Sequence, residues 1–522
     1  MEKAELIAAV HALEVRGLRT GDISAVTYNS REVSSGACFV AIRGKWTDGH
    51  TYIPDALARG ATLVVGDIPP PEDFPPYRTY LRVENPRRAL GTLAAAFYRY
   101  PSHRMAVIGV TGTDGKTTTA NLIEAMLAAA GRHTGLMSTV EFKIGATRRP
   151  NNTRFTTLEA PEVQAVLAEM VTAGVECAVV ETTSSGLELH RVEGVEYDVA
   201  VLTNITSEHL EVHGTWENYR RAKAMLFERV DPERAKPEVA GVPGACVLNA
   251  DDPSCAYLRS FCRAPVLTYG IEQIADVRGE DIHLGADGTR FRALFPDGTV
   301  CDIHTPLVAR FNVSNCLAAL TVGYVCGLSP EVMARALSDF PGVSGRMERI
   351  DEGQPFTVIV DYAHTAESLE KVLEVLRPLT SGRLMVVFGS AGDRDRVKRP
   401  HMGAVAARLA DFAVITDEDP REEDAESILR EIAAGAFEAG GREGEQFTCI
   451  VGRRAGIARA FALAGAGDTV LLAGKGHEQS IFIGREKLPW DDRRVAREEL
   501  AALGYRHGPI VGTSGFPPTD VL

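Results

Sequence analysis

The chain has 522 residues, of which 45% are hydrophobic and 24% are charged, and its net charge is −14 at pH 7. This is the composition of an ordinary folded protein, with length for roughly three domains of about 150 residues. The acidic balance argues against a general binder of nucleic acid or anionic membranes, so an anionic substrate must be held by local cations and backbone N–H groups.

The cysteines and the N-terminal residues indicate the cellular compartment of the protein. The nine cysteines include no C-x-x-C pair, and Cys177, Cys246 and Cys316 sit in apolar runs typical of buried reduced thiols. The first residues lack the apolar core of a signal peptide, and no apolar run is long enough to cross a membrane. We therefore expect a cytoplasmic protein.

Residues 1–103 predict a small α/β domain. The apolar runs 38–42 and 61–65 have the composition of buried strands, and each is soon followed by glycine. Between the start of the chain and the first of these strands lies the pair Ser30-Arg31, which by itself predicts only a turn with a solvated arginine.

Residues 105–131 predict a phosphate-binding loop. The apolar run 105–110 indicates a buried strand, a glycine-rich turn follows, and an apolar-faced helix then runs from Lys116 to the stop at Gly131. Strand, glycine loop, Lys-Thr and helix form an anion cradle, in which Lys116 supplies a point charge and the Thr117 hydroxyl can reach Mg²⁺. The match to G-x-x-x-x-G-K-[ST] is imperfect, because Val110 stands where the pattern has glycine. The alternative is a chance glycine-rich turn.

Further strands alternate with helices through residues 104–343 and predict a largely parallel, doubly wound sheet. The candidate strands 177–181 and 199–203 end beside Glu181 and shortly before His209, and a third candidate is 245–249. Functional groups of such sheets lie at the carboxyl ends of strands, so Glu181 and His209 are candidate Mg²⁺-site residues. Either residue alone is more simply explained as a satisfied polar side chain. Residues 274–305 are strand-like, with two Asp-Gly turns, and predict a β insertion.

The last third of the chain predicts a second doubly wound α/β domain. Strand-like runs occur at 356–361, 384–388, 412–416 and 469–473, with helices such as 367–377 between them. Residues 389–394 contain two glycines but lack G-x-G-x-x-G spacing, which argues against a dinucleotide site. Residues 506–522 are rich in glycine and proline and predict a loose tail.

Several motifs occur in the order found in one enzyme family. GTDGKTT (112–118) is followed by ETTSSGL (181–187), by TNITSEHLEVHG (203–214) and by GKGHE (474–478). Each is weak alone, but the ordered set, from Ser30 to Arg493, resembles the Mur ligases, the ATP-dependent amino-acid-adding enzymes of peptidoglycan synthesis, and among them the MurE type. The resemblance implies a UDP-substrate-binding domain at 1–103, a central ATP-binding domain at 104–343 and a C-terminal amino-acid-binding domain at 344–522.

The resemblance also implies a site for ATP and Mg²⁺. Lys116, Glu181, His209 and Lys223 would be catalytic, and Thr117 would join the last three at the metal. In the family the lysine that matches Lys223 is carbamylated, although periodicity alone makes Lys223 a solvated lysine beside an apolar helix face. The implied ATP contacts are Gly112, Thr113, Asp114, Gly115, Lys116, Thr117, Thr118, Asn312, Asn315, Arg346 and Asp361. The last two lie in the third domain, which implies domain closure over ATP. Asn312 could instead cap its helix.

Two substrate sites are implied as well. The contacts to the UDP-linked sugar-peptide would be Ser30, Arg31, Thr156, Thr157, Thr183, Ser184 and Arg191. The incoming amino acid would meet Arg394, Glu418, Asp419, Pro420, Arg421, Gly474 and Glu478.

The residues at 418–421 bear on which amino acid is added. They read EDPR, where the family's meso-diaminopimelate-adding enzymes have D-N-P-R. Arg421 can hold a carboxylate bidentately, whereas Asp419 replaces an amide donor by an acceptor and so favours an ammonium. We expect meso-diaminopimelate, with L-lysine or L-ornithine as alternatives, and a monomeric enzyme that inserts into no membrane and binds no nucleic acid.

Three other functions remain open. A folylpolyglutamate-synthetase-like ligase is opposed by the Ser30-Arg31 domain and by the stretch 419–421. A P-loop switch or motor protein is opposed by Val110 and the later ligase motifs. A non-catalytic binding homologue gains weight from departures at Asp114, Ser185 and Leu189, where the family usually has Asn, His and Gln.

Overall fold

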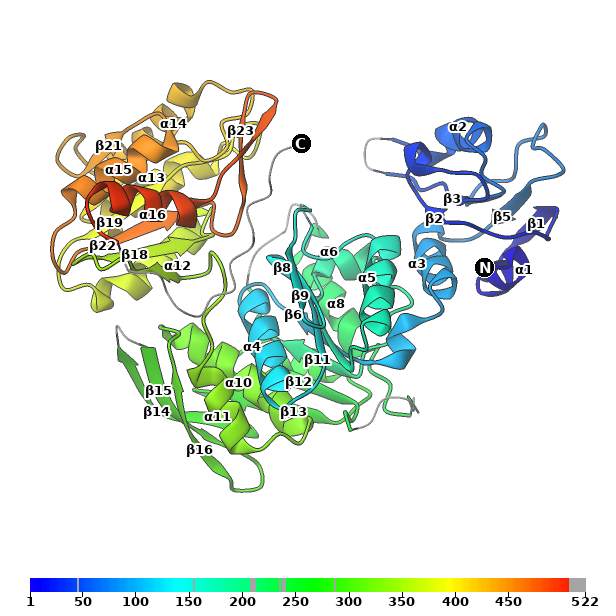
Figure 1. Ribbon diagram of the computed structural model, residues 1–522, viewed down its shortest axis with the longest axis horizontal. Helices are drawn as coiled ribbons and strands as arrows, with labels where there is room; N and C mark the ends of the chain where they lie inside the picture. Colours follow the sequence, from blue (N-terminus) through cyan, green and yellow to red (C-terminus); the bar gives the residue numbers. More distant parts are fainter. Residues whose placement is uncertain are drawn as a thin grey trace. The chain divides into compact units, whose positions relative to one another are not determined.

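The computed structural model describes residues 1–506, apart from 45, 46, 154, 207–212, 234, 235, 237–240, 286 and 287. The chain divides into two compact units, residues 1–341 and 342–522 (Figure 1). The domain boundaries after residues 103 and 343 stay predictions. No helix among the described residues is both long and apolar enough to cross a bilayer.

The first unit opens with a five-stranded sheet in the order β1-β5-β4-β3-β2, parallel except for β1. Both faces are covered, since Leu63 and Val65 join one buried cluster while Val64 joins another. A strand that is buried on both faces has a continuous apolar sequence, and residues 61–65 could therefore be predicted as a strand. The elements are α1 (Lys3–Ala8), β1 (Glu14–Gly17), β2 (Val26–Thr27), η1 (Ser30–Glu32), β3 (Cys38–Val40), η2 (Gly49–Tyr52), α2 (Ile53–Ala58), β4 (Leu63–Gly66), β5 (Thr79–Arg82), α3 (Pro86–Phe97) and η3 (Pro101–Arg104).

The same unit continues into an 11-stranded sheet, ordered β16-β15-β14-β13-β12-β11-β6-β10-β7-β8-β9. Its middle, from β7 to β14, is parallel, and antiparallel strands complete both edges. The strands are β6 (Ala106–Thr111), β7 (Thr134–Met137), β8 (Glu141–Ile144), β9 (Thr147–Pro150), β10 (Cys177–Glu181), β11 (Val199–Leu202), β12 (Ala245–Asn249), β13 (Val266–Gly270), β14 (Val277–Gly285), β15 (Gly288–Leu294) and β16 (Val300–Thr305). The predicted doubly wound sheet and the β insertion are confirmed.

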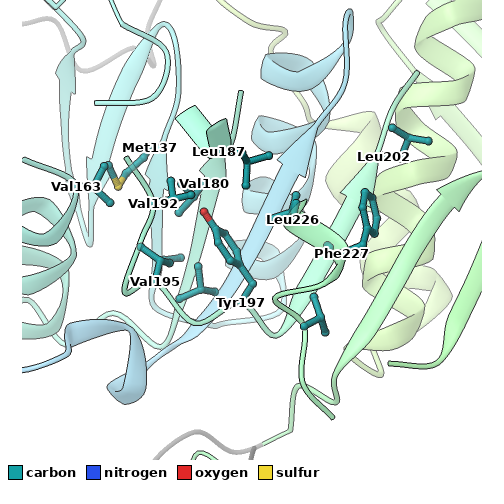
Figure 2. Close-up of a cluster of buried hydrophobic side chains, with 14 of the residues drawn as sticks. Met137, Val163, Val180, Leu187, Val192, Val195, Tyr197, Leu202, Leu226 and Phe227 are labelled. Carbon is teal, nitrogen blue, oxygen red and sulfur yellow. The ribbon is translucent and has the colours of Figure 1, made fainter. Parts of the chain in front are cut away.

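Helices pack on this sheet around a large apolar core. They are α4 (Lys116–Ala129), α5 (Ala160–Thr172), α6 (Ser184–Glu188), α8 (Trp216–Phe227), α9 (Cys255–Arg259), α10 (Arg310–Val325) and α11 (Pro330–Ser338). Figure 2 shows the Tyr197 ring between Val180, Val195 and Leu226, and its hydroxyl lies 3.0 Å from Thr182 Oγ1, so the polar end is satisfied inside the core. The nine cysteines form no disulfide, and Cys177, Cys246 and Cys316 are buried as expected.

The second unit has a six-stranded sheet ordered β17-β18-β22-β19-β20-β21, parallel except for β17. Two separate cores lie against it, one including α12, α13 and α14 and the other α15 and α16, so helices cover both faces. The elements are β17 (Glu348–Ile350), β18 (Thr357–Asp361), α12 (Ala366–Leu376), η4 (Arg377–Leu379), β19 (Leu384–Phe388), α13 (Lys398–Leu409), β20 (Phe412–Ile415), α14 (Ala425–Glu438), β21 (Phe447–Cys449), α15 (Arg453–Leu463), β22 (Thr469–Ala473), β23 (Ser480–Ile483), β24 (Glu486–Pro489) and α16 (Asp492–Ala502). Apart from residue 506, the predicted tail lies outside the described residues.

Candidate active site

The loop between β6 and α4 has the geometry of a phosphate cradle. Gly112 and Gly115 have φ values of +155° and +80°, which side chains rarely allow. A Cβ atom on Gly112 would lie 1.8 Å from Thr203 Oγ1, and one on Gly115 would lie 2.3 Å from Asn315 Oδ1. Both positions therefore require glycine, and the loop delivers its backbone to the start of α4, where an anion is favoured.

The neighbouring strand end fixes this loop. Asn204 Oδ1 accepts a 2.9 Å hydrogen bond from the backbone N–H of Asp114, and Thr203 Oγ1 donates to the Asp114 carbonyl at 2.6 Å. Asp114 is exposed, and both of these hydrogen bonds are made by its backbone. Lys116 Nζ donates to the carbonyls of Gly112 (3.0 Å) and Thr113 (2.7 Å), which keeps its charge over the loop. Thr118 follows, half-buried, in the first turn of α4.

Glu181 gathers hydroxyl groups beside the loop. It ends β10, is 1% exposed, and its Oε2 accepts hydrogen bonds from Thr117 Oγ1 (3.1 Å) and Thr139 Oγ1 (3.0 Å). The Thr139 N–H donates to its Oε1 at 2.9 Å. A carboxylate and hydroxyl oxygens next to phosphates suit Mg²⁺, which keeps several waters rather than a full protein cage. The described residues contain no cluster of three or more His, Cys, Asp and Glu side chains set to hold a metal. His209 lies outside the described residues.

Lys223 is buried behind the phosphate loop. It is 1% exposed, its Nζ donates to the Gly112 carbonyl at 2.7 Å, and it lies 4.4 Å from the centroid of the Tyr219 ring. The Tyr219 hydroxyl is 2.9 Å from Thr113 Oγ1, so α8 touches the loop twice. Helical periodicity favoured a solvated Lys223. That prediction is wrong, because the face of α8 that carries Lys223 packs against the loop. Its carbamylation stays a prediction.

Two asparagines on α10 face the same loop. Asn315 Nδ2 donates to Asn312 Oδ1 at 3.0 Å, and Asn315 Oδ1 accepts from Thr119 Oγ1 on α4 at 3.3 Å. Asn312 Nδ2 donates back to the Val308 carbonyl, and the residue that precedes the helix is Ala309. The prediction that both amides share one side is confirmed, and the alternative in which Asn312 caps the helix is wrong.

The residues predicted for the sugar-peptide substrate form a chain of contacts away from Glu181. Thr157 Oγ1 donates to the Glu181 carbonyl at 3.1 Å and accepts from the Thr183 N–H at 3.0 Å. Arg191 donates to the Thr157 carbonyl (3.2 Å), pairs with Glu159 (2.8 Å) and lies 4.6 Å from the Phe155 ring centroid. Thr156 Oγ1 accepts a hydrogen bond from Thr139 Oγ1.

Ser184, Ser30 and Arg31 complete the set of residues predicted to bind the sugar-peptide substrate. Ser184 Oγ lies 3.0 Å from Nε2 of His213, a buried histidine that sequence reasoning did not select although it belongs to the segment 203–214. Ser30 is buried and Arg31 exposed in η1, a turn capped by the Asn29 side chain. Thr139 was also missed, because it lies in no recognisable motif.

In the second unit, one predicted nucleotide contact, Asp361, is the last residue of β18, and the other, Arg346, precedes β17. Asp361 accepts hydrogen bonds from the N–H groups of Met347 (2.7 Å) and Ala363 (2.9 Å). The Arg346 guanidinium lies 4.7 Å from the Tyr362 ring centroid. Burial lowers the pKa of the neighbouring His364 to about 4 and that of His477 to about 3, so both rings are neutral at physiological pH.

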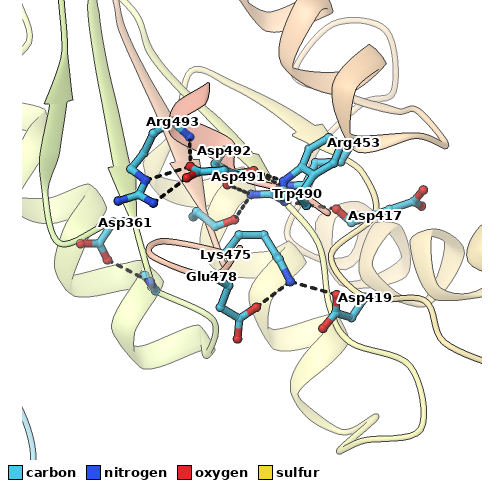
Figure 3. A network of polar contacts seen from close by, with 12 residues as sticks. Asp361, Asp417, Asp419, Arg453, Lys475, Glu478, Trp490, Asp491, Asp492 and Arg493 are labelled. Carbon is cyan, nitrogen blue, oxygen red and sulfur yellow. Dashed lines mark hydrogen bonds and ion pairs between the residues drawn. The ribbon is translucent and has the colours of Figure 1, made fainter. Parts of the chain in front are cut away.

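Two of the predicted amino-acid-binding residues, Asp419 and Glu478, flank a buried lysine that was not selected from the sequence (Figure 3). Lys475 Nζ lies 2.9 Å from Asp419 Oδ1 and 2.6 Å from Glu478 Oε2. Asp419 would favour an incoming ammonium most strongly if its carboxylate were unpaired, and the contact with Lys475 already balances part of its charge. Glu418 and Pro420 are buried, whereas Arg394 is exposed. Gly474, with φ +108°, packs against the Glu418 carboxylate.

A second ion pair supports the same edge of the sheet. Arg453 is fully buried, and its Nε lies 2.8 Å from Asp492 Oδ1, while its other nitrogens donate to the carbonyls of Asp417 and Ala473 (Figure 3). Trp490 donates to the same Asp492 oxygen. These contacts fix the strand ends that carry Glu418 and Gly474.

Family models and individual relatives both match the chain. The Mur ligase middle domain matches residues 110–323, the Mur ligase glutamate ligase domain matches 345–476, and the Mur ligase family catalytic domain matches 22–98. A UDP-N-acetylmuramyl-tripeptide synthetase of Roseiflexus sp. (strain RS-1) is 51% identical over 93% of this chain and 96% of its own. A UDP-N-acetylmuramoyl-L-alanyl-D-glutamate–2,6-diaminopimelate ligase of Geobacillus kaustophilus (strain HTA426) is 43% identical over 92% and 96%.

A solved structure of a UDP-N-acetylmuramoyl-L-alanyl-D-glutamate–2,6-diaminopimelate ligase has the same fold. It superposes with a TM-score of 0.67 at 29% identity and covers 97% of this chain and 99% of its own. Fold, phosphate loop and relatives agree along almost the entire sequence. The chain belongs to the Mur ligase family, among the ligases of the MurE type.

Proposed function

We propose that this protein is an ATP-dependent ligase that adds meso-diaminopimelate to UDP-N-acetylmuramoyl-L-Ala-D-Glu in peptidoglycan precursor synthesis. The observation that carries the proposal is the near full-length similarity to ligases named for this reaction, together with an intact phosphate loop. Arg421 favours meso-diaminopimelate over L-lysine or L-ornithine, because its guanidinium can bind the second carboxylate that only meso-diaminopimelate carries.

ATP is needed because a carboxylate does not react with an amine at neutral pH, since its leaving group would be oxide. The γ-phosphoryl group passes to an oxygen of the D-glutamyl carboxylate, which gives an acyl phosphate and ADP. The amine nitrogen then bonds to the acyl carbon, the bond from that carbon to the phosphate oxygen breaks, and the nitrogen loses a proton. No protein nucleophile is required.

The residues of the first unit supply positioning and charge. Loop N–H groups and Lys116 stabilise the negative charge that spreads over the transferred phosphoryl group. Thr117 and Glu181 would hold Mg²⁺, with His209 and Lys223 added from the family resemblance, and the bound ion supplies further charge neutralisation at the phosphates. Thr157 and Arg191 orient the sugar-peptide beside Glu181, in keeping with their contacts.

The proposed reaction also places the protein in a compartment. It consumes ATP and a UDP-linked sugar-peptide, so we propose that the protein works in the cytoplasm. That it acts as a monomer stays a prediction.

The test is phosphate release by the purified protein with Mg²⁺-ATP. We expect release only when UDP-N-acetylmuramoyl-L-Ala-D-Glu and meso-diaminopimelate are both present. Release without any acceptor amine would favour a switch or motor protein, and ATP binding without release under any condition would favour a non-catalytic homologue.

A further inference from the structure

A buried ammonium lies between two carboxylates at the carboxyl end of the second unit's sheet. Lys475 is 0% exposed, and Figure 3 shows its Nζ directed at Asp419 on one side and Glu478 on the other, at 2.9 and 2.6 Å. Burial alone would lower the pKa of Lys475, but Glu478 and Asp419 outweigh burial and raise it. The lysine is therefore charged at neutral pH, and it balances one of the two carboxylates outright.

One carboxylate oxygen of Asp419 is engaged twice by this arrangement. Its Oδ1 accepts from Lys475 Nζ and also from the backbone N–H of Phe482 at 3.0 Å, which ties the β23–β24 hairpin to the strand end. Because one oxygen of Asp419 is shared by two donors and part of its charge is balanced by Lys475, the carboxylate gains less from an incoming ammonium than an unpaired carboxylate would. Asp419 thus acts as a support for the pocket rather than as a contact that selects the substrate.

Arg421 takes no part in this cluster. Its backbone N–H donates to the Phe482 carbonyl at 3.0 Å, its φ is +55°, and its guanidinium lies 5.4 Å from the Phe482 ring centroid. Its Nε is buried and has no hydrogen-bond partner among the described residues. Arg421 is the cation nearest in sequence to Asp419, and an ion pair between these two residues would consume the group that can bind a carboxylate. Lys475 supplies Asp419 with a different cation.

We propose that Lys475 is a positioning residue that makes an aspartate at 419 compatible with a diamino dicarboxylic acid. It holds Asp419 and Glu478 in place, and Arg421 stays available for the second carboxylate. The inference rests on the proposed function, since it names how that same pocket accepts meso-diaminopimelate.

The test measures KM for meso-diaminopimelate by phosphate release in Lys475→Met, Asp419→Asn and the double variant. Removing one partner of a buried pair is costly, so we expect Lys475→Met to raise this KM at least about tenfold, with the KM for ATP changed less than about threefold. Asp419→Asn keeps the shape of the side chain, and we expect a change under about threefold. The double variant should be closer to wild type than Lys475→Met, because the carboxylate left without its cation is gone. Lys371→Met, which removes a half-exposed lysine on α12, is the matched control and should leave this KM unchanged.

Two results would overturn the inference. One is a KM for Lys475→Met equal to that of wild type. The other is a marked rise in KM for Asp419→Asn, or a switch of that variant between meso-diaminopimelate and L-lysine, which would make Asp419 a direct contact. The second result is decisive even if Lys475→Met does not fold. If the wild-type protein itself releases no phosphate with meso-diaminopimelate, the proposed function fails instead.

Discussion

Lys223 shows how a single residue can depart from what local sequence indicates. Helical spacing places it beside Leu226 and Phe227, and an exposed lysine next to an apolar stripe is the ordinary outcome. The structure buries it because the Gly112 carbonyl, 111 residues away in the chain, accepts its hydrogen bond. Only the motif resemblance selected this lysine, since burial by a distant loop leaves no mark on the local pattern.

Replacing Lys223 with alanine should abolish turnover. The change removes the buried amine beside the phosphate loop, so we expect kcat for phosphate release to fall roughly a hundredfold or more. Arg221→Ala, a half-exposed position on the same helix, is the control and should stay near wild type. Full activity of Lys223→Ala would contradict a role for Lys223 at the metal site.

Glu193 is a residue that no motif indicated, and it follows Arg191 closely. Its carboxylate pairs with Arg229 (2.7 Å), Arg88 (3.2 Å) and His190 (3.4 Å). Burial would raise the pKa of Glu193, but His190 and Arg229 outweigh burial and lower it to about 2. It thereby joins α3 and the segment just after α8 to the turn that carries Arg191.

This depressed pKa predicts a pH-dependent stability. The contribution of Glu193 is fully present above its unfolded pKa and is lost as pH falls through the folded value of about 2. Glu193→Gln should lower the free energy of unfolding at pH 7 by on the order of 3 kcal/mol, and the difference from wild type should shrink between pH 4.5 and 3. Urea unfolding of both proteins at several pH values measures this difference in the free energy of unfolding. A difference that does not change with pH would contradict a lowered pKa of Glu193.

At the scale of elements, the strands were the most predictable feature. Those buried on both faces, such as β6, β10 and β22, are continuous apolar runs bounded by glycine or polar residues. The hairpins β8–β9 and β23–β24 were not predicted, because their strands have only four residues each and, except for β23, contain several polar side chains. Their pairing depends on neighbouring segments rather than on any pattern of their own.

The helix α8 depends on the residue that precedes it, Thr215, for its start. Thr215 Oγ1 accepts a hydrogen bond from the Asn218 N–H at 3.2 Å and so caps the helix that carries Tyr219 and Lys223. Thr215→Ala should lower the free energy of unfolding by about 1 kcal/mol, whereas Thr215→Ser should retain most of it. Urea unfolding of the two variants provides the measurement, and equal losses would show that the hydroxyl is not the cap.

At the scale of the whole molecule, the sequence predicted two doubly wound sheets and most of the residues that meet at the phosphate loop. It could not predict the partner of Asp419, since Lys475 is 56 residues away and lies in a motif noted only for its glycine and glutamate. The loop and the strand ends could be predicted because their chemistry is local. The ion pairs could not, because they form only when the sheets have assembled.

The central claim is that this ligase adds meso-diaminopimelate. It is tested most directly by a competition in which the protein receives Mg²⁺-ATP, UDP-N-acetylmuramoyl-L-Ala-D-Glu and equal concentrations of meso-diaminopimelate, L-lysine and L-ornithine. Mass spectrometry then identifies the UDP-linked product. We predict that the meso-diaminopimelate adduct dominates, because Arg421 binds a carboxylate that the other two lack. A product containing lysine or ornithine would contradict the account of the pocket.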